Sequence, residues 1–553
     1  MDALLTSLSA AAAVALALPP TVRRLQLSRA KHPSLTGHAR MARRIARQIP
    51  AYAYDSRQFF RADDPDEAVA RAREAAFARL SDLFRARYAR SREATEAVRA
   101  GLSDLQFTGL YRVPFQFAGP VRENLGAGAF MAASNGVTIT DLDGNVFHDL
   151  AGSYGVNLFG VDFYRACMAE GAARVADLGP VLGSLHPVVA DNVARLRALS
   201  GLDEVSFHMS GTEAVMQAVR LARYHTGRRR IVRFCGAYHG WWGDVQPGIG
   251  NPVAAHDTLT LAEMSERTLH VLATRRDVAC VLVNPLQALH PNAGAPSDSA
   301  LIDSARAARF DRTAYTEWLA RLREVCTRRG IVLILDEVFL GFRLAKGGAQ
   351  EYFGVRADLV TYGKTLGGGL PVGVLCGRTD LMRRYRTDRP VDICFARGTF
   401  NAHPQVMGAM GAFLDRLETP EVTALYAHLD ATWDGRAAAL NRRLEAEDLP
   451  VRVAHLSSVW TVLYTRPSRY NWMLQFYLRA AGLHLSWVGT GRLIFSLAYG
   501  DAEFAAVSDR FAAACAAMKA DGWWDGPATT DKAIRRAVLK EAARVRLGLA
   551  ARG

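Results

Sequence analysis

Two short runs, each leading to a reactive side chain, constrain the fold of this chain more than any other feature. Residues 331–335 read Ile-Val-Leu-Ile-Leu and lead into Asp336. A wholly apolar run of this length predicts a buried parallel strand, and open α/β sheets bind ligands at the carboxyl ends of such strands. Residues 359–362 form a second run, followed by Lys364 among glycines. A lysine there can act as a Schiff-base nucleophile when its surroundings lower its pKa, although either feature alone is more often structural.

A third segment predicts a binding site for phosphate. Ser210, Gly211 and Thr212 precede a helical pattern that continues to Tyr224. Small residues at the start of a helix leave backbone N–H groups free for an anion, at the positive end of the helix dipole. The start of this helix is therefore the expected phosphate cup.

The run 231–234 adds an aromatic ring and an imidazole, because it leads into Tyr238 and His239. In chain order, the segments now supply a phosphate cup, an aromatic platform, an acid and a lysine. This set of groups fits pyridoxal phosphate. Tyr238 would stack on its ring, Asp336 would keep its pyridine nitrogen protonated and Lys364 would form the Schiff base.

Five segments make the sequence resemble the class III, fold-type I aminotransferases that depend on pyridoxal phosphate, nearest to the glutamate-1-semialdehyde aminomutase branch. The resemblance spans about residues 105–525, and the segments are jointly very specific. They are SGTEAVMQAVRLAR (210–223), GAYHGWWGD (236–244), LILDEVFLGFR (333–343), DLVTYGKTLGGGLPVGVLCG (358–377) and RGTFNAHP (397–404).

The resemblance implies an α/β, fold-type I architecture with a large domain around a mainly parallel sheet and a small α+β domain. An extra helical N-terminal extension is expected, with a helix from Pro65 whose apolar residues recur at helical spacing as far as Tyr88. The expected segments are an apolar N-terminal stretch (1–20), the extension (21–104), the N-terminal part of the small domain (105–200), the large cofactor-binding domain (201–404), the small C-terminal domain (405–525) and a basic helical tail (526–553).

The resemblance also implies the residues of the site. Lys364, Asp336 and Tyr238 are the expected catalytic residues. The expected cofactor contacts are Ser210, Gly211, Thr212, Tyr238, His239, Asp336, Val338, Lys364 and Thr399. Thr399 resembles the threonine that reaches the cofactor phosphate of the neighbouring subunit, which implies a homodimer with shared active sites. The weaker, substrate-side candidates are Tyr154, Trp241, Arg397 and Arg492.

Two stretches depart from the family pattern. Where the family commonly has Gly-His-x-His-Pro, this chain has Gly160-Val-Asp-Phe-Tyr164. Where the family usually has the glutamate of a Glu-Pro pair, this chain has Asn284, which can form hydrogen bonds but carries no charge. Residues 292–312 follow as an expected insertion, in the form of a surface loop or lid.

The expected reaction moves an amino group from an amine or amino-acid donor to a carbonyl acceptor, with Lys364 as the Schiff-base residue and general base. The aromatic segment 111–117, Tyr154 and Trp241 favour a bulky or apolar aldehyde or ketone as the acceptor. A 2,1-aminomutase of the glutamate-1-semialdehyde type is the second interpretation, and the two departures weaken it. A non-catalytic scaffold with this fold is the third. It would predict loss of the site residues, all of which are present.

The charge distribution bears on partners. The net charge is +14, and much of the excess lies before residue 100 and in the last thirty residues. A basic surface favours anions such as phosphate-bearing substrates, acidic carrier proteins or membrane headgroups, although solvated helix faces are the simpler explanation. The sequence has no motif in which basic and aromatic residues alternate, which argues against a nucleic acid as binding partner.

Cysteines and the N-terminus bear on location. The seven cysteines show no CxxC spacing, so no metal site is expected and a reducing compartment fits.

The apolar stretch from Ala3 to Leu18 is shorter than the roughly 20 residues that a spanning helix needs. No positive charge precedes it, unlike in a secretory signal. A docked helix, a membrane-touching anchor and a wrongly assigned start remain as interpretations. We expect a cytoplasmic protein, with peripheral membrane association as the alternative.

Overall fold

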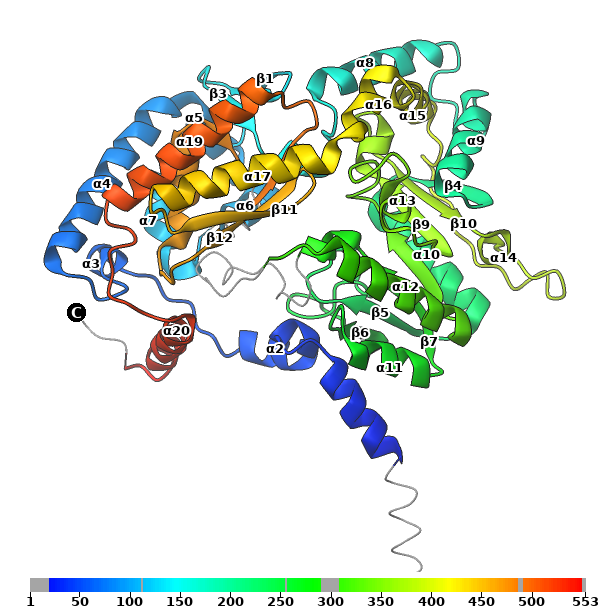
Figure 1. Ribbon diagram of the computed structural model, residues 1–553, viewed down its shortest axis with the longest axis horizontal. Coiled ribbons are helices and arrows are strands. Elements are labelled where there is room, and N and C mark those ends of the chain that lie inside the picture. The colour runs from blue at the N-terminus through cyan, green and yellow to red at the C-terminus, as the bar shows by residue number, and fades with distance from the viewer. Residues whose placement is uncertain (1–18, 111–112, 254–255, 290–307, 486–490, 550–553) are drawn as a thin grey trace, which may run out of the picture.

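The computed structural model describes residues 19–110, 113–253, 256–289, 308–485 and 491–549. Three sheets organise these residues, with four, seven and three strands. In Figure 1 the seven-stranded sheet and its helices lie on the right, and the two smaller sheets lie on the left with the N-terminal helices around them. This division agrees with the large and small domains of the expected fold.

The seven-stranded sheet is mainly parallel. Its order is β4-β10-β9-β8-β7-β5-β6, and only the pairs made by β10 are antiparallel. Its strands are β4 (Glu204–His208), β5 (Arg230–Phe234), β6 (Thr258–Leu261), β7 (Val278–Val283), β8 (Val332–Asp336), β9 (Leu359–Gly363) and β10 (Gly373–Gly377). The predicted buried parallel strand is confirmed, because β8 is buried at every residue and ends at Asp336.

Helices cover both faces of this sheet. Successive side chains of a strand point to opposite faces, so Val332 and Ile334 join one apolar cluster with Val215, whereas Leu333 and Leu335 join another. The helices of this half of the molecule are α8 (Val161–Arg174), α9 (Val188–Ser200), α10 (Gly211–Thr226), α11 (Glu266–Thr274), α12 (Arg312–Arg329), α13 (Gly348–Phe353), α14 (Thr379–Met382) and α15 (Pro404–Leu417).

The two smaller sheets combine residues from both sides of the large sheet in sequence. One sheet has the order β1-β2-β3-β13 and the other β11-β12-β14. The strands are β1 (Met131–Asn135), β2 (Thr138–Asp141), β3 (Val146–Asp149), β11 (Val451–Leu456), β12 (Val459–Tyr464), β13 (Leu483–His484) and β14 (Arg492–Ile494). Their helices are α7 (Ala118–Asn124), α17 (Leu429–Ala446), α18 (Leu474–Ala480) and α19 (Asp501–Ala520), whereas α16 (Pro420–Ala427) lies beside α15.

The last strand, β14, is short and ends at Ile494. Beyond Ile494 the chain leaves the sheet, because the N–H of Leu497 donates to the carbonyl of Leu158 instead of to a strand. The N–H of Ile494 itself already donates to the carbonyl of Leu150. These bonds fasten the C-terminal part of the small domain to the segment that follows β3.

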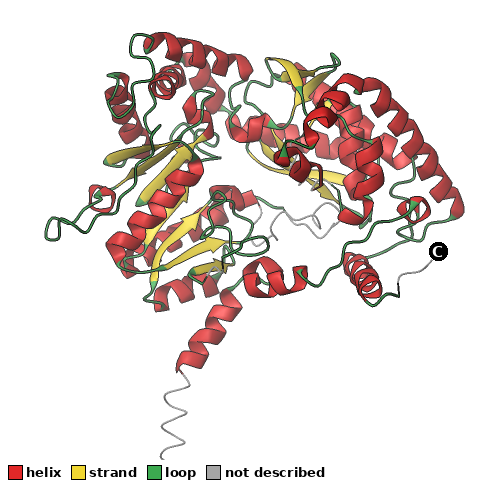
Figure 2. Cartoon of the chain, turned by 180° about the vertical axis from the view of Figure 1, so that it is seen from behind, coloured by secondary structure: helices red, strands yellow, loops and turns green. Residues whose placement is uncertain are grey.

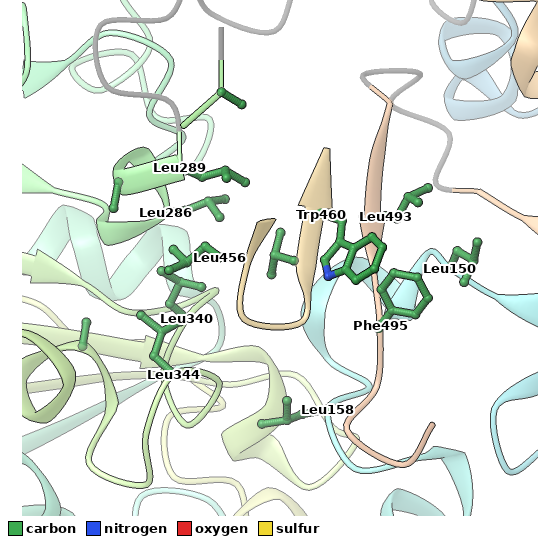
Figure 3. Close-up of a cluster of buried hydrophobic side chains, with 14 of the residues drawn as sticks. Leu150, Leu158, Leu286, Leu289, Leu340, Leu344, Leu456, Trp460, Leu493 and Phe495 are labelled. Carbon is green, nitrogen blue, oxygen red and sulfur yellow. The ribbon is translucent and has the colours of Figure 1, made fainter. Parts of the chain in front are cut away.

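A continuous apolar core joins the two domains. Figure 3 shows Leu286 and Leu340 of the large domain facing Leu456 of the small domain, with Trp460 and Phe495 behind it, all of them buried. A buried arginine lies at the same junction: the Nη1 of Arg343 donates to Ser458 Oγ and to the carbonyl of Phe495, each over 2.7 Å. Burial lowers the pKa of Arg343 to about 10. The two domains are therefore held by both packing and a charged hydrogen-bond donor.

The N-terminal extension spans both domains. Residues 19–30 are helical, and Lys31 then forms an antiparallel bridge with Leu261 on the edge strand β6. Further on, Phe59 and Phe60 are buried among aromatic residues of the small domain. The helices are α2 (Ala39–Ala46), α3 (Ser56–Phe60), α4 (Glu67–Arg87), α5 (Ala89–Arg99) and α6 (Ser103–Leu110). The helix predicted from Pro65 is α4, with Asp66 at its N-cap.

Two predicted segments fall where no structure is described. The apolar stretch from Ala3 to Leu18 lies outside the described residues, and so does most of the predicted insertion, at 290–307. Within the described residues, no helix is both long enough and apolar enough to span a bilayer.

A buried ion pair that anchors the extension gives a stability prediction. Arg73 has a fully buried side chain that binds both carboxylate oxygens of Asp63 and the carbonyl of Gly522 beyond α19. Asp63→Ala should lower the free energy of unfolding by about 3 kcal/mol, because it leaves a buried guanidinium without its counter-charge. Urea denaturation followed by tryptophan fluorescence measures this change.

The matched control is Asp82→Ala, which removes an exposed carboxylate from its pair with Arg85 on the same helix. That change should stay within about 0.5 kcal/mol. Equal effects of the two substitutions would contradict the anchoring role of Arg73.

Candidate active site

The ends of two neighbouring strands bring an acid and a lysine together. β8 ends at Asp336, whose register partner on β9 is Thr361, and Lys364 follows the end of β9. Asp336 is only 3% exposed, and its Oδ1 accepts hydrogen bonds from the N–H of Val338 (3.2 Å) and from Thr361 Oγ1 (3.3 Å). The parallel pairing of β8 and β9 thus places both reactive groups at one edge of the sheet.

His239 holds the second oxygen of this carboxylate. Its Nδ1 lies 2.7 Å from Asp336 Oδ2 and, since a carboxylate only accepts, we assign Nδ1–H as the donor. Burial lowers the pKa of His239, and the nearby Asp336 carboxylate opposes this effect. A neutral imidazole with its proton on Nδ1 fits both observations. Its Nε2 is buried and has no hydrogen-bond partner within the described structure.

Lys364 adopts an uncommon backbone conformation. It opens the 3-10 turn η6 (Lys364–Gly367) with φ +46°, in the left-handed region that costs roughly 1–2 kcal/mol for a residue with a side chain. Such strain concentrates at functional sites. Burial lowers the pKa of its ammonium group, and Asp336 partly opposes the shift. Its Nζ lies 5.7 Å from the centre of the Phe339 ring.

The side chain of Tyr164, far from this turn in the sequence, supports the strained turn at Lys364. The hydroxyl of Tyr164 on α8 forms a hydrogen bond with Thr365 Oγ1 and accepts one from the N–H of Leu158 at 3.1 Å. Tyr164 is the last residue of the stretch that departs from the family pattern. Sequence reasoning noted the departure but missed this contact, because it joins residues 201 positions apart.

The start of α10 lies beside the end of β8. The Oγ of Ser210 caps the helix by accepting from the N–H of Glu213 at 3.3 Å, and the N–H groups of Gly211 and Thr212 have no acceptor within the helix. A Cβ at Gly211 would lie 2.5 Å from a methyl of Val338, so only glycine allows this approach. The predicted phosphate cup is therefore adjacent to the acid and lysine.

The loop after β5 carries Tyr238, whose ring is 57% exposed. Burial and the charge of Asp336 both raise the pKa of its phenol. Asn284 fixes the backbone here, since its Nδ2 donates to the carbonyl of Tyr238 at 3.1 Å and its Oδ1 accepts from the N–H of Leu286 at 3.1 Å. The second departure from the family pattern thus positions the predicted aromatic platform.

Of the substrate-side candidates, Tyr154 precedes a glycine that lies against the lysine side chain. A Cβ on the next residue, Gly155, would lie 2.7 Å from the Phe339 ring and 3.4 Å from Lys364 Cδ. Tyr154 itself has φ +57° and is partly exposed.

The other candidates lie elsewhere. Trp241 is 75% exposed, and Arg397 and Thr399 are exposed on the loop before α15. Arg492 lies on β14, in register with Thr461. Within the described residues, no hydrogen bond or ion pair joins Trp241, Arg397 or Thr399 to Asp336 or Lys364.

A family model for class-III aminotransferases matches residues 122–514. The chain belongs to the class III aminotransferase family. Glutamate-1-semialdehyde 2,1-aminomutase of Nitratidesulfovibrio vulgaris (strain DP4) is 34% identical over 418 residues, which cover 72% of this chain and 95% of that protein. The extension and the C-terminal tail lie outside the family match.

Solved structures agree with this assignment. A transaminase with PLP bound is 27% identical, has a TM-score of 0.62 and covers 79% of this chain and 98% of that chain. A glutamate-1-semialdehyde-aminomutase from Pseudomonas aeruginosa PAO1 shares the fold, with 20% identity, a TM-score of 0.65 and coverage of 82% of this chain and 99% of that chain.

Pyridoxal phosphate, PLP, is the cofactor of this enzyme class, and the residues present fit it. The free N–H groups at the start of α10 suit a phosphate, and a buried carboxylate at the end of β8 suits a protonated ring nitrogen. Lys364, with its lowered pKa, suits the reaction with an aldehyde. Within the described residues, no group of three or more His, Cys, Asp or Glu side chains could hold a metal ion.

The electrostatic link between Asp336 and Lys364 gives a prediction. The Asp336 carboxylate raises the pKa of Lys364 against the effect of burial. Asp336→Asn should therefore move the pH midpoint for arylation of Lys364 by trinitrobenzenesulfonate, in the cofactor-free protein, to lower pH. Mass spectrometry of the peptide that contains Lys364 measures this midpoint.

The matched control is Asp177→Asn, which removes an exposed carboxylate and should leave the midpoint unchanged. A midpoint that stays in place or rises in Asp336→Asn would show that the field of Asp336 does not reach the amine.

Proposed function

We propose that this class III enzyme is a transaminase that uses Lys364 as its Schiff-base lysine and general base. The observation that carries the proposal is the lysine of lowered pKa beside the buried Asp336–His239 pair. Ser210, Gly211, Thr212 and Val338 are the proposed contacts of the cofactor phosphate and ring, together with Tyr238.

The chemistry divides between the cofactor and the chain. Bound PLP supplies an aldehyde that condenses with amines and a ring that accepts electrons. Asp336 holds a proton on the ring nitrogen, because a carboxylate favours the cation beside it. His239 keeps the carboxylate oriented and shields it from water. With PLP bound, the amine of Lys364 would act as the general base that takes the proton from the substrate carbon.

We further propose a bulky or apolar carbonyl acceptor. Support comes from two aromatic residues: Tyr154, whose neighbour Gly155 lies against the Lys364 side chain, and the partly exposed Tyr238.

The second candidate is a 2,1-aminomutase. Its support is the name of the 34% identical relative, which is an aminomutase. Tyr164 and Asn284 stand where this chain departs from the family pattern, and both contact the site. These differences favour the transaminase, which needs a separate donor and acceptor.

We propose that two copies complete each site. The loop around Thr399 exposes the apolar side chains of Ile393, Phe395 and Phe400, and such exposed groups are typical of an interface. In a two-fold dimer the same loop of the partner subunit would reach the phosphate cup.

All seven cysteines are unpaired and buried, which supports a reducing, cytoplasmic location.

A spectroscopic assay tests the reaction. The purified protein with PLP should show a visible absorption band that depends on Lys364 and that one amine donor bleaches without an acceptor. Lys364→Ala should lose the band and all turnover, whereas Lys346→Ala, which removes a lysine paired with Glu418, should keep both. A band that no donor changes would favour the aminomutase, and a band that survives in Lys364→Ala would exclude this site.

Mixed dimers test the shared site. Thr399→Ala should weaken PLP binding by about ten- to a hundredfold, because one hydrogen bond to a charged group contributes roughly 1.5–3 kcal/mol. Mixing Thr399→Ala subunits with Lys364→Ala subunits should restore one tight site for each dimer, with Lys364 from the first variant and Thr399 from the second. Activity at limiting PLP that stays at the level of unmixed Thr399→Ala would mean that Thr399 serves its own subunit.

A further inference from the structure

The basic excess of this chain lies almost wholly in two terminal segments outside the family match. Residues 3–54 contain eight basic and no acidic residues, and residues 529–553 contain seven basic and two acidic residues. The class-III match covers only 122–514. The conserved catalytic fold therefore does not account for this charge.

The fold brings these two segments together. The C-terminal helix α20 (Asp531–Arg546) docks through Glu541, whose carboxylate accepts hydrogen bonds from Tyr52 (3.1 Å), Tyr54 (2.5 Å) and Arg469 (2.6 Å). Arg546 Nη1 also donates to the carbonyl of Gln48, just after α2, at 3.0 Å. In Figures 1 and 2, the helix at 19–30, α2 and α20 lie along the same lower edge of the molecule.

The outer face of α20 combines cations with aliphatic side chains. Arg536, Lys540 and Arg544 follow one another at intervals of four residues, so they share one face of the helix. Leu539 and Leu547 lie on that same face and are 59% and 71% exposed. The opposite face is buried through Ile534 and Ala542.

The helices of the N-terminal segment repeat this composition. On α2, Arg40, Arg44 and the following Arg47 recur at helical spacing and are exposed, beside the half-exposed Met41. On residues 19–30, Leu25 is exposed among arginines. Arg40, Arg44, Arg47, Arg536, Lys540 and Arg544 make no ion pair within the described structure. The acidic residue in the middle of α20, Glu541, is turned inward toward Arg469.

We propose that this edge, the faces of α2, α20 and residues 19–30, binds an anionic membrane surface peripherally. Helices that present arginine, lysine and leucine together on an exposed face are typical of binding at the headgroup level, where cations meet lipid phosphates and aliphatic chains enter the interface. A nucleic acid would pair with the cations but would leave the exposed leucines without an apolar partner.

Vesicle flotation of the full-length, PLP-loaded protein tests the proposal. The protein should float with vesicles of phosphatidylcholine and phosphatidylglycerol but not with phosphatidylcholine alone, and high salt should reduce the bound fraction. Two triple variants, Arg40→Glu/Arg44→Glu/Arg47→Glu and Arg536→Glu/Lys540→Glu/Arg544→Glu, should each lower the partition coefficient by about a hundredfold or more.

A matched control reverses three exposed arginines on other faces, Arg197, Arg442 and Arg452 on α9, α17 and β11. This variant should float like the unmodified protein, and all variants should keep their activity with soluble substrates. The proposal is overturned if anionic vesicles do not bind, if binding persists in both edge variants, or if the control variant weakens binding equally. It is also overturned if only an acidic protein or nucleic acid binds the edge.

Discussion

The burial of Asp336 at the end of β8 is the constraint on which the site depends. A carboxylate in the interior is costly unless hydrogen bonds satisfy it. Its partners come from three places: its own turn at Val338, the neighbouring strand at Thr361 and the loop after β5 at His239. These hydrogen bonds hold the ends of β5, β8 and β9 together. Because Lys364 directly follows β9, they also place the lysine beside Asp336.

The same point needs support from the segment that follows β3, because Lys364 has a left-handed backbone. Tyr164 on α8 holds the hydroxyl of Thr365, and Gly155 allows the preceding loop to lie against the lysine side chain. The position of that loop depends in turn on bonds from Ile494 and Leu497 of the small domain. The interdomain core and the buried Arg343 therefore keep the site geometry fixed as well as holding the domains together.

The terminal segments add contacts at the periphery of this arrangement. The extension reaches the edge strand β6 through Lys31 and the small domain through Arg73, and α20 closes over it through Glu541. These contacts use the inward faces of the added helices, which leaves their cationic faces toward solvent. The catalytic fold and the basic edge are thus separate features of one molecule, joined by a few buried polar contacts.

The sequence by itself determined the elements whose signals are local. The apolar run before Asp336, the small residues that open α10 and the glycines around Lys364 predicted a buried strand, a phosphate cup and a strand-end lysine, and β8, α10 and β9 lie where expected. Only the tertiary structure decided which distant groups meet: His239 with Asp336, Tyr164 with Thr365, and Gln48 with Arg546. It also ended β14 at Ile494, because the next N–H groups find acceptors outside the sheet. Periodicity and composition act over a few residues, whereas contacts between residues far apart in the chain depend on topology, which no local pattern encodes.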